Sequence, residues 1–223
     1  MKEIAIITGV SKGIGLALAK KLLEHNYYVI GTSTTGNNDV ILDANFELHE
    51  LNLGHTESIK AFKSIIASKN IKVDLLINNA GIGPDLGFML PEEKSYDQTF
   101  EINTKGTVFF TEAILEHLNK GSKIINISSK MGSISNCTRV NSIAYCMSKT
   151  ALNMYTKLLA NRLQGINDVA TIHPGWVQTT ISSSNVNAPL TPEDSANNIV
   201  KYLQTKLKNG DYWDAEANVL LSW

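Results

Sequence analysis

Short runs of apolar residues, rich in β-branched side chains, recur along the chain with little polar alternation. Such runs are typical of parallel strands that are covered on both faces. Stretches of helical pattern separate them, and this order predicts an α/β fold with one doubly wound parallel sheet and helices on both faces. The predicted strands are Ile4–Thr8, Tyr28–Thr32, Phe46–Leu51, Val73–Asn78, Lys123–Ser128 and Val169–His173; the predicted helices are Gly13–His25, Thr56–Lys69, Tyr96–Asn119, Ser142–Gln164 and Pro192–Lys208.

Two of the predicted helices begin with a start signal. Thr191 is followed by a proline and two acids, which predicts a hydroxyl cap and a favourable first turn. Thr56, followed by Glu57, predicts a second hydroxyl cap. Residues Gln178–Leu190 are polar and rich in Ser and Asn, which predicts a mobile loop after the sixth strand.

Composition removes several classes of function. The chain has 223 residues, 43% of them hydrophobic and 18% charged, which suits a single domain spanning 1–223. The formal net charge of −1 gives no field that would recruit nucleic acid or an anionic membrane. No apolar run reaches the length of a membrane span, and Cys137 and Cys146 fit no zinc pattern. We therefore expect a cytoplasmic protein with two free thiols and no metal, nucleic acid or membrane partner.

A glycine-rich turn lies between the first predicted strand and the first predicted helix. It reads Thr8-Gly9-Val10-Ser11-Lys12-Gly13-Ile14-Gly15. Glycines permit a tight turn and a close approach of the backbone to a pyrophosphate, and the helix N-terminus offers unpaired N–H groups to that anion. A purely structural turn is the alternative, but the position after the first strand favours a dinucleotide site.

The end of the second predicted strand bears on the choice of cofactor. An NAD-specific site usually places an acid there to hold the ribose 2′-hydroxyl. Here the chain reads Gly31-Thr32-Ser33-Thr34-Thr35-Gly36, and the first acid is Asp39. Hydroxyl groups and Lys12 offer hydrogen bonds to a 2′-phosphate instead. We therefore predict NADP(H) rather than NAD(H).

Tyr145 and Lys149 lie one helical turn apart, so their side chains share a helix face. A phenol with a pKa of about 10 is a poor acid–base group at neutral pH. An ammonium about 4 Å away, at an effective dielectric of about 20, would lower that pKa by up to roughly three units. We therefore predict proton transfer by Tyr145. A second copy of the short pattern, Tyr202 with Lys206, is interpreted as a surface feature of the last helix.

Polar residues follow two further strands at the sheet edge where such sheets bind ligands. Ser128 and Ser129 end the fifth predicted strand, where a hydroxyl either binds a carbonyl oxygen or caps the strand. The run Asn78-Asn79-Ala80-Gly81 ends the fourth. Asn103 stands within a helical pattern that Asn does not favour, and both a functional and an ordinary solvated Asn fit there.

In this order the motifs resemble the short-chain dehydrogenase/reductase family, from Thr8 to about Thr179. The resemblance includes the segment Pro174-Gly175-Trp176-Val177-Gln178-Thr179 after the sixth strand. It implies a Rossmann fold and an NAD(P)H-dependent enzyme that reduces a small-molecule carbonyl to an alcohol. The long loop Gly132–Val140 and the Pro-Gly-Trp-Val segment are similar to the C-factor-like carbonyl reductases.

The resemblance also implies a role for each site residue. Tyr145 would donate the proton in reduction, and Lys149 would lower its pKa and hold the nicotinamide ribose. Ser129 would orient the carbonyl oxygen, and Asn103 would keep a water-linked proton path to Lys149. The expected cofactor contacts, besides Tyr145 and Lys149, are Gly9, Ser11, Lys12, Gly13, Ile14, Gly15, Thr34, Asn52, Leu53, Asn79, Ala80, Gly81, Pro174, Gly175, Val177 and Thr179.

Some positions leave alternatives open. Ser129 lies sixteen residues before Tyr145, whereas thirteen is usual in the family, and Ser133 lies twelve before it. Two other functions compete with a carbonyl reductase: a β-ketoacyl carrier-protein reductase, and an NADP(H)-binding signalling or sensor protein without significant turnover.

The substrate is not predicted, because specificity would lie in the loops Gly83–Pro91, Gly132–Val140 and Gln178–Leu190. Their apolar residues fit either a pocket wall or ordinary packing: Phe88, Met89, Leu90, Met131 and Trp176. The helix Ser142–Gln164 carries apolar residues that fit either a core or a dimer face, so homodimer and homotetramer both stay open.

Overall fold

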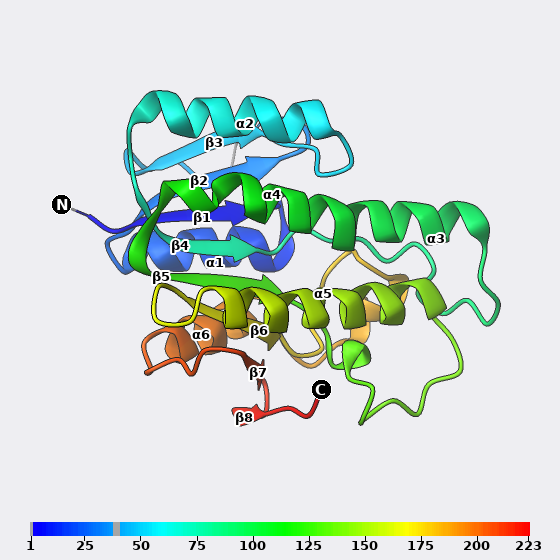
Figure 1. Ribbon diagram of the computed structural model, residues 1–223. Coiled ribbons are helices and arrows are strands. Elements are labelled where there is room, and N and C mark those ends of the chain that lie inside the picture. Colours follow the sequence, from blue (N-terminus) through cyan, green and yellow to red (C-terminus); the bar gives the residue numbers. More distant parts are fainter. Residues whose placement is uncertain (1, 38–40) are drawn as a thin grey trace.

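The computed structural model describes residues 2–37 and 41–223, and its strands form one sheet between two layers of helices (Figure 1). The strand order is β3-β2-β1-β4-β5-β6-β7-β8, and every neighbouring pair is parallel except β7 with β8. The strands are β1 (Ile4–Thr8), β2 (Tyr28–Ser33), β3 (Phe46–Glu50), β4 (Val73–Asn78), β5 (Leu118–Ile127), β6 (Asp168–His173), β7 (Asp211–Asp214) and β8 (Val219–Leu220). The predicted Rossmann-type sheet is confirmed.

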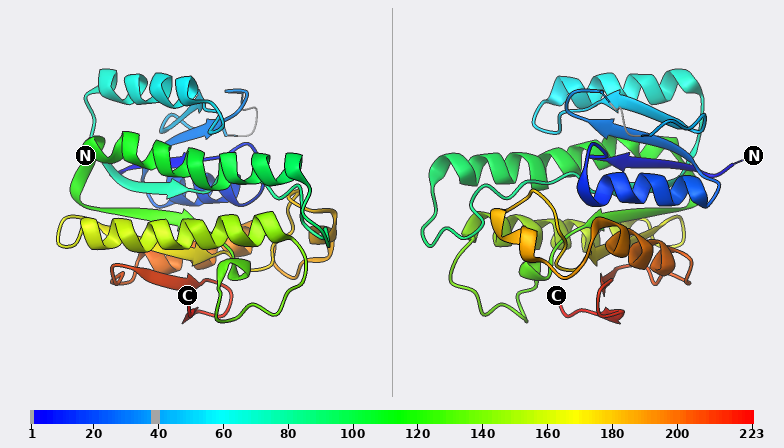
Figure 2. Two further views of the ribbon diagram at one scale, coloured as in Figure 1. Left: turned by 45° about the vertical axis from the view of Figure 1, so that its right-hand side comes forward. Right: turned by 180° about the vertical axis from the view of Figure 1, so that it is seen from behind.

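The helices lie in two layers that the views of Figure 2 separate. Helices α1 and α6 cover one face, and α2, α4 and α5 cover the other. Their bounds are α1 (Gly13–Glu24), α2 (Thr56–Lys69), α3 (Glu93–Phe100), α4 (Thr107–Ile114), α5 (Ile143–Arg162) and α6 (Pro192–Leu203).

Burial on both faces explains why the strands read as continuous apolar runs. In β1, Ile6 and Ile7 are both fully buried, yet they belong to different cores. Ile7 packs in the cluster that contains Leu18 of α1, and Ile6 packs in the cluster that contains Phe62 of α2 and Phe110 of α4. Successive strand residues point to opposite faces, so each core requires its own apolar residue.

The structure corrects the prediction of one continuous helix over Tyr96–Asn119. The helical stretch begins at Glu93, after Glu92 caps it by accepting a hydrogen bond from the Ser95 amide. It then passes through a π-helical segment, Glu101–Gly106, into α4. Gly106 lies against the Leu53 carbonyl group, where a Cβ would overlap, so the widened turn brings two backbones together.

Other boundaries also differ from the sequence-based expectation. The Thr191 cap is confirmed as a reciprocal capping box with Asp194. The Thr56 cap is wrong, because Thr56 is already helical and its predecessor makes no side-chain cap bond. Tyr202 is not a surface residue: it is buried against Trp213, and α6 ends before exposed Lys206.

Within the described residues, Cys137 and Cys146 are free thiols, as expected. None of the described helices has the length and apolar character needed to cross a membrane. No group of three or more His, Cys, Asp or Glu side chains in residues 2–37 and 41–223 is arranged to hold a metal ion.

Candidate active site

The glycine turn after β1 lies against the end of β4. Gly9 has a left-handed φ of +75°, and its amide donates to the Thr32 carbonyl group at 3.0 Å. The Asn79 amide nitrogen Nδ2 donates to the carbonyl groups of Thr8, at 2.9 Å, and Gly9, at 3.1 Å. A Cβ at Gly15 would overlap the Gly9 carbonyl oxygen and Asn79, so only glycine allows this approach.

Helix α1 begins without the usual partners for its free N–H groups. Lys12 occupies the cap position with no side-chain cap hydrogen bond, and the first turn holds no acid. This combination leaves amide donors and the positive end of the helix dipole available to an anion. The Thr179 methyl group lies 3.4 Å from where a Cβ of Gly13 would stand, so the chain after β6 reaches over the turn. The arrangement fits a dinucleotide pyrophosphate.

Three of the other expected cofactor contacts flank the turn, just after the ends of β2 and β3. Thr34 directly follows β2 and is exposed, and Asp39 lies outside the described residues. After β3, the Asn52 oxygen Oδ1 accepts from the Gly54 amide at 3.0 Å. Leu53 is buried against Gly106 of the π-helical segment.

The segment after β6 is anchored at several points. Ser195 donates to the Pro174 carbonyl group at 2.7 Å, and Gly175 has a φ of +94°. Buried Val177 pairs with Leu190 in an isolated bridge. Asn185 donates to the Val177 carbonyl group, at 2.8 Å, and to the Thr179 hydroxyl, at 3.3 Å. A 3₁₀ helix, Ser183–Asn187, thus occupies part of the predicted loop.

Tyr145 and Lys149 project from α5 toward the end of β5. They are 8% and 4% exposed, and Lys149 Nζ lies 5.7 Å from the Tyr145 ring centroid. Lys149 donates to the Ile127 carbonyl group at 3.0 Å. The Ser129 side chain is close enough to the Tyr145 phenol to lower its pKa, whereas the Ser133 hydroxyl donates to the Ser222 carbonyl group. The structure therefore brings Ser129, and not Ser133, to Tyr145.

Burial sets the proton affinities of this pair. It raises the pKa of Tyr145 to about 12, against the opposing effect of the Ser129 side chain. Burial also lowers the pKa of Lys149 to about 8. The expectation that the ammonium would lower the Tyr145 pKa is therefore wrong for this geometry, because it left out desolvation of the phenolate. Tyr145 carries its proton at neutral pH.

Asn103 lies in the π-helical segment and holds the chain that follows β4. Its Oδ1 accepts from the Ile82 amide at 2.8 Å, and its Nδ2 donates to the Ile82 carbonyl group, at 2.8 Å, and to the Ser148 hydroxyl, at 3.2 Å. Gly81 lies between Asn103 and Lys149: a Cβ there would stand 3.3 Å from Asn103 Oδ1 and 3.4 Å from Lys149 Nζ. Both helices are thereby tied to the end of β4.

Sequence reasoning missed three residues beside the site. Asp85 accepts a hydrogen bond from the Tyr145 amide, and Tyr212 donates to the Ser129 carbonyl group. The Ser148 hydroxyl accepts a hydrogen bond from the Asn103 side-chain amide. Asp85 stands in a Gly- and Pro-rich stretch typical of a turn, and Tyr212 stands in a four-residue strand. No sequence signal distinguished any of the three.

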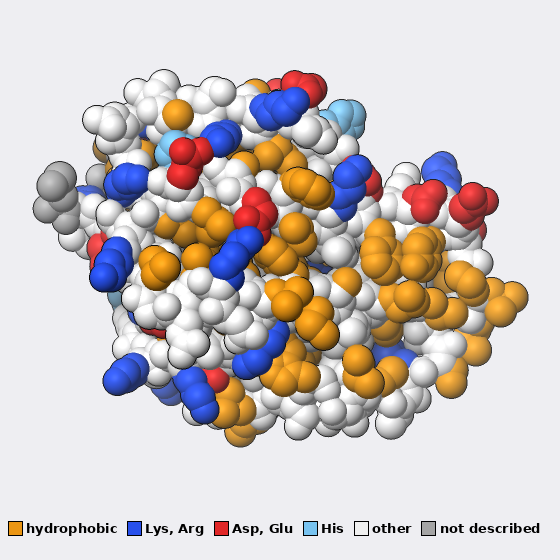
Figure 3. All heavy atoms as spheres, in the orientation of Figure 1, with side chains coloured by type: hydrophobic (Ala, Val, Ile, Leu, Met, Phe, Trp, Pro, Cys, Tyr) orange, Lys and Arg blue, Asp and Glu red, His pale blue; other side chains and the backbone are white. Residues whose placement is uncertain are grey.

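Exposed apolar side chains gather near the N-terminus of α5. Phe88, Met89 and Leu90 come from the chain after β4, and Ile134 and Val140 come from the chain after β5. Figure 3 shows hydrophobic side chains concentrated at the right-hand end of the molecule, where α3 and α5 begin in Figure 1. Of the apolar loop residues expected to line a pocket, Phe88, Met89, Leu90 and Trp176 are exposed.

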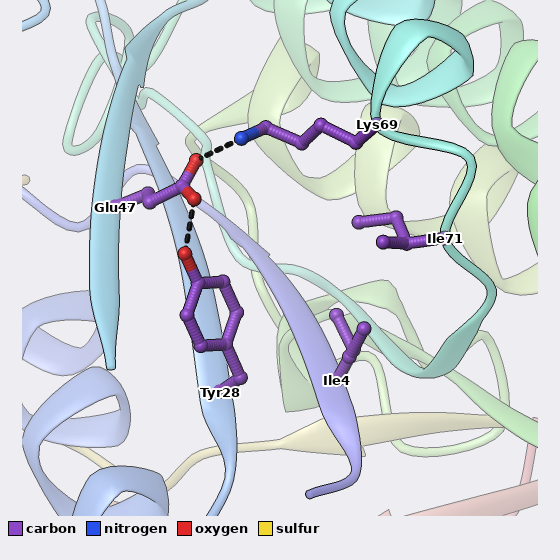
Figure 4. A pocket seen from close by; sticks show the side chains of 5 residues that line it. All are labelled: Ile4, Tyr28, Glu47, Lys69 and Ile71. Carbon is purple, nitrogen blue, oxygen red and sulfur yellow. Dashed lines mark hydrogen bonds and ion pairs between the residues drawn. The ribbon is translucent and has the colours of Figure 1, made fainter. Parts of the chain in front are cut away.

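A separate cavity of about 380 Å³ lies at the opposite, amino-terminal edge of the sheet (Figure 4). It is lined by Ile4, Tyr28, Glu47, Lys69 and Ile71. Glu47 accepts hydrogen bonds from Tyr28 and from Lys69, so its polar lining is already paired. This cavity contains none of the residues predicted for catalysis.

Comparison with known proteins identifies the family of the chain. The sequence model of the family described as short chain dehydrogenase matches residues 3–189. The chain therefore belongs to the short-chain dehydrogenase family and is an NAD(P)H-dependent oxidoreductase. It is 31% identical over 191 residues to the 3-oxoacyl-[acyl-carrier-protein] reductase FabG of Vibrio cholerae, covering 82% of this chain and 76% of that protein.

Solved structures extend the likeness over the whole chain. The carbonyl reductase Sniffer of D. melanogaster has a TM-score of 0.84 and 27% identity, with both chains covered fully. A short-chain dehydrogenase/reductase from Burkholderia multivorans with bound NADP has a TM-score of 0.89 at 23% identity, also over both full chains, and shows the shared fold. The predicted membership of the short-chain dehydrogenase/reductase family is confirmed.

Proposed function

We propose that the protein is an NADP(H)-dependent carbonyl reductase in which Tyr145 donates the proton. One observation carries the proposal: a buried phenol, a hydroxyl and an ammonium, from Tyr145, Ser129 and Lys149, meet at the sheet edge that holds the glycine turn. A neutral phenol beside a hydroxyl is suited to protonate a carbonyl oxygen.

Each of these side chains has a distinct task in reduction. NADPH, when bound, supplies the hydride. Tyr145, neutral at pH 7 because burial raises its pKa to about 12, gives its proton to the substrate oxygen. Ser129 donates a hydrogen bond to the same oxygen, and Lys149, held by the Ile127 carbonyl group, stabilises the phenolate that remains. Asn103 fixes the neighbouring backbone and keeps a proton path toward Lys149.

The residues expected to hold the cofactor support a dinucleotide. The first turn of α1, the turn glycines and Thr179 form the place for the pyrophosphate. Exposed Thr34 and Lys12 supply polar groups for a 2′-phosphate, which favours NADP(H). The remaining contacts are proposed at the positions given above, with Asn52 and Leu53 toward adenine and Val177 toward the nicotinamide.

The substrate we propose is a small carbonyl compound with an apolar substituent. The exposed Phe88, Met89 and Leu90 on one side and Ile134 and Val140 on the other support it, since such groups pair with apolar ligands. A 3-oxoacyl group attached to a carrier protein is the second candidate, and the similarity to the Vibrio cholerae 3-oxoacyl-[acyl-carrier-protein] reductase favours it.

The first experiment titrates the purified protein with NADPH and NADH, following quenching of tryptophan fluorescence, and then adds aldehydes, diketones and a β-ketoacyl thioester. The proposal expects tighter binding of NADPH and oxidation of it by at least one simple carbonyl. Turnover of the thioester alone would favour the carrier-protein substrate. Binding without any turnover would favour the signalling or sensor function, and binding of neither cofactor would refute the proposal.

Assembly and location stay predictions. Phe109 of α4 and Met154 and Leu158 of α5 are exposed, which is compatible with a homodimer or homotetramer. We retain the expectation of a cytoplasmic enzyme with no nucleic acid partner.

A further inference from the structure

The chain after β4 serves as the cap of α5. Ser142, at the cap position, has a left-handed φ of +60° and makes no side-chain cap bond to its own helix. Instead, its amide donates to the Phe88 carbonyl group at 2.9 Å, and its hydroxyl accepts from the Gly87 amide at 3.0 Å. Asp85 Oδ2 accepts from the Tyr145 amide, in the first turn, at 3.1 Å. The free N–H of the residue predicted to donate the proton is thus held by a carboxylate from another element.

The burial of Asp85 at this position lowers the stability of the fold. Asp85 is only 2% exposed, and its second carboxylate oxygen, Oδ1, has no hydrogen-bond partner among the described residues. A buried carboxylate with an unpaired oxygen destabilises a fold. Nearby Gly83 lies against the phenol ring, since a Cβ there would stand 3.2 Å from Tyr145 Cδ2. The incompletely compensated carboxylate is therefore held at the backbone amide of Tyr145, in the same first turn of α5.

The groups that face Tyr145 come from four elements. Its own helix supplies the Cys146 thiol and the Lys149 ammonium, the end of β5 supplies Ser129, and β7 supplies Tyr212. The chain after β4 supplies Asp85, which is the carboxylic acid of the set. Burial raises the pKa of the phenol most and Ser129 lowers it, while Cys146, Asp85 and Tyr212, in that order, each raise it by a smaller amount.

We propose that Asp85 is a positioning residue for Tyr145: its carboxylate anchors the first turn of α5 through the Tyr145 amide, and its charge favours the protonated form of the phenol. The proposal rests on the proposed function, because it assigns Asp85 a part in the proton donation by Tyr145. The same side chain thus sets where the phenol stands and how readily the phenol regains its proton after each transfer.

The test separates charge from anchoring. Asp85→Asn keeps an oxygen for the Tyr145 amide but removes the charge. The protein is labelled with 3-fluorotyrosine, whose phenol ionises at lower pH than tyrosine, and Tyr145→Phe identifies the Tyr145 signal in fluorine NMR. We expect the signal of Asp85→Asn to titrate about one pH unit lower than that of the unsubstituted chain. Equal titration of the two would overturn the electrostatic part.

Ser142→Ala is the matched control, because it breaks the neighbouring bond to Gly87 without changing any charge. It should titrate like the unsubstituted chain, and a shift as large as that of Asp85→Asn would overturn the assignment to charge. Asp85→Ala should speed hydrogen exchange of the Tyr145 amide, and Asp85→Asn should not. Equal exchange in both variants and the unsubstituted chain would overturn the anchoring part. None of these measurements requires turnover, so absence of carbonyl reduction would refute the proposed function alone.

Discussion

The pKa values of ionisable side chains have different causes at the two edges of the sheet. At the amino edge, hydrogen bonds from Lys69, Tyr28 and His49 to Glu47 outweigh the effect of burial and lower its pKa to about 2. At the carboxyl edge, burial prevails, raising the pKa of Tyr145 to about 12 and lowering that of Lys149 to about 8. Charged groups that are paired stabilise a fold, whereas buried groups whose pKa is shifted by desolvation mark a candidate site of chemistry.

The largest effect that distinguishes the two edges should come from Tyr145→Phe. The variant keeps the ring that fills the site and loses the proton donor, so kcat/KM for carbonyl reduction should fall about a thousandfold. NADPH affinity and the melting temperature should change little. Tyr202→Phe, which alters a buried tyrosine bonded to Asp211 on the distant side of the sheet, serves as control and should retain activity. Full activity of Tyr145→Phe would show that the carboxyl edge does not owe its chemistry to this phenol.

Lys149→Met should reduce the rate about a hundredfold and yet stabilise the fold at pH 7. The Lys149 pKa is about 8 in the folded chain and 10.5 in the unfolded chain, so the unfolded chain binds more protons between these two pH values. The free energy of unfolding should therefore rise with pH from about 8 toward 10.5, and Lys149→Met should lack this rise.

The gain of Lys149→Met at pH 7 should be about 1–2 kcal/mol after loss of the bond to the Ile127 carbonyl group. Urea unfolding at several pH values measures it. The matching substitution of exposed Lys206 should change neither rate nor stability. If Lys149→Met is less stable than the unsubstituted chain, the buried ammonium is fully compensated by its surroundings, as the Glu47 carboxylate is, and the prediction is wrong.

Tyr212→Phe should have a moderate effect on both properties. Its hydroxyl donates to the Ser129 carbonyl group at 2.6 Å in a buried position. Losing it leaves that carbonyl group unsatisfied, which should reduce stability by about 1–2 kcal/mol. Because Ser129 is then held less firmly, kcat should fall a few-fold while NADPH affinity is unchanged. An unchanged kcat would show that the hydroxyl of Ser129 is positioned without Tyr212.

The smallest effect, confined to stability, should come from Glu47→Gln. The carboxylate bonds Lys69 at 2.6 Å on a partly exposed surface, so its loss should reduce the free energy of unfolding by about 1 kcal/mol and leave activity unchanged. The Glu47 pKa is lowered in the folded chain from 4.5 to about 2. Its contribution is present above pH 4.5 and is lost as the pH falls toward 2, and the variant should lack this loss. Reduced activity of Glu47→Gln would show that the amino edge of the sheet contributes to catalysis.

Much of the architecture was predictable because a strand that is buried on both faces has a continuous run of apolar residues. Ile6 and Ile7 serve two cores, and runs of that kind placed six of the strands. Strand β7 was missed because it has four residues, among them Asp211 and Asp214, and does not read as an apolar run. The π-helical segment was missed because it depends on a contact across the chain, where Gly106 meets Leu53.

The candidate site was predictable in its members but not in its energetics. Short motifs named Tyr145, Lys149 and Ser129, and the structure brings them together. The pKa of Tyr145 was predicted in the wrong direction, because a Coulomb estimate from helical spacing contains no desolvation. Asp85 could not be found from sequence, because its role comes from the fold that sets it at the N-terminus of α5.

The most direct test of the central claim, reduction of a carbonyl with Tyr145 as proton donor, follows the hydride itself. NADPH deuterated at the transferable position is incubated with the protein and an apolar aldehyde or diketone, and the products are analysed by mass spectrometry. We predict an alcohol that carries one deuterium at the former carbonyl carbon, formed by the unsubstituted chain and nearly absent with Tyr145→Phe. Deuterated alcohol formed equally by Tyr145→Phe, or bound NADPH that never delivers deuterium to any carbonyl, would contradict the account.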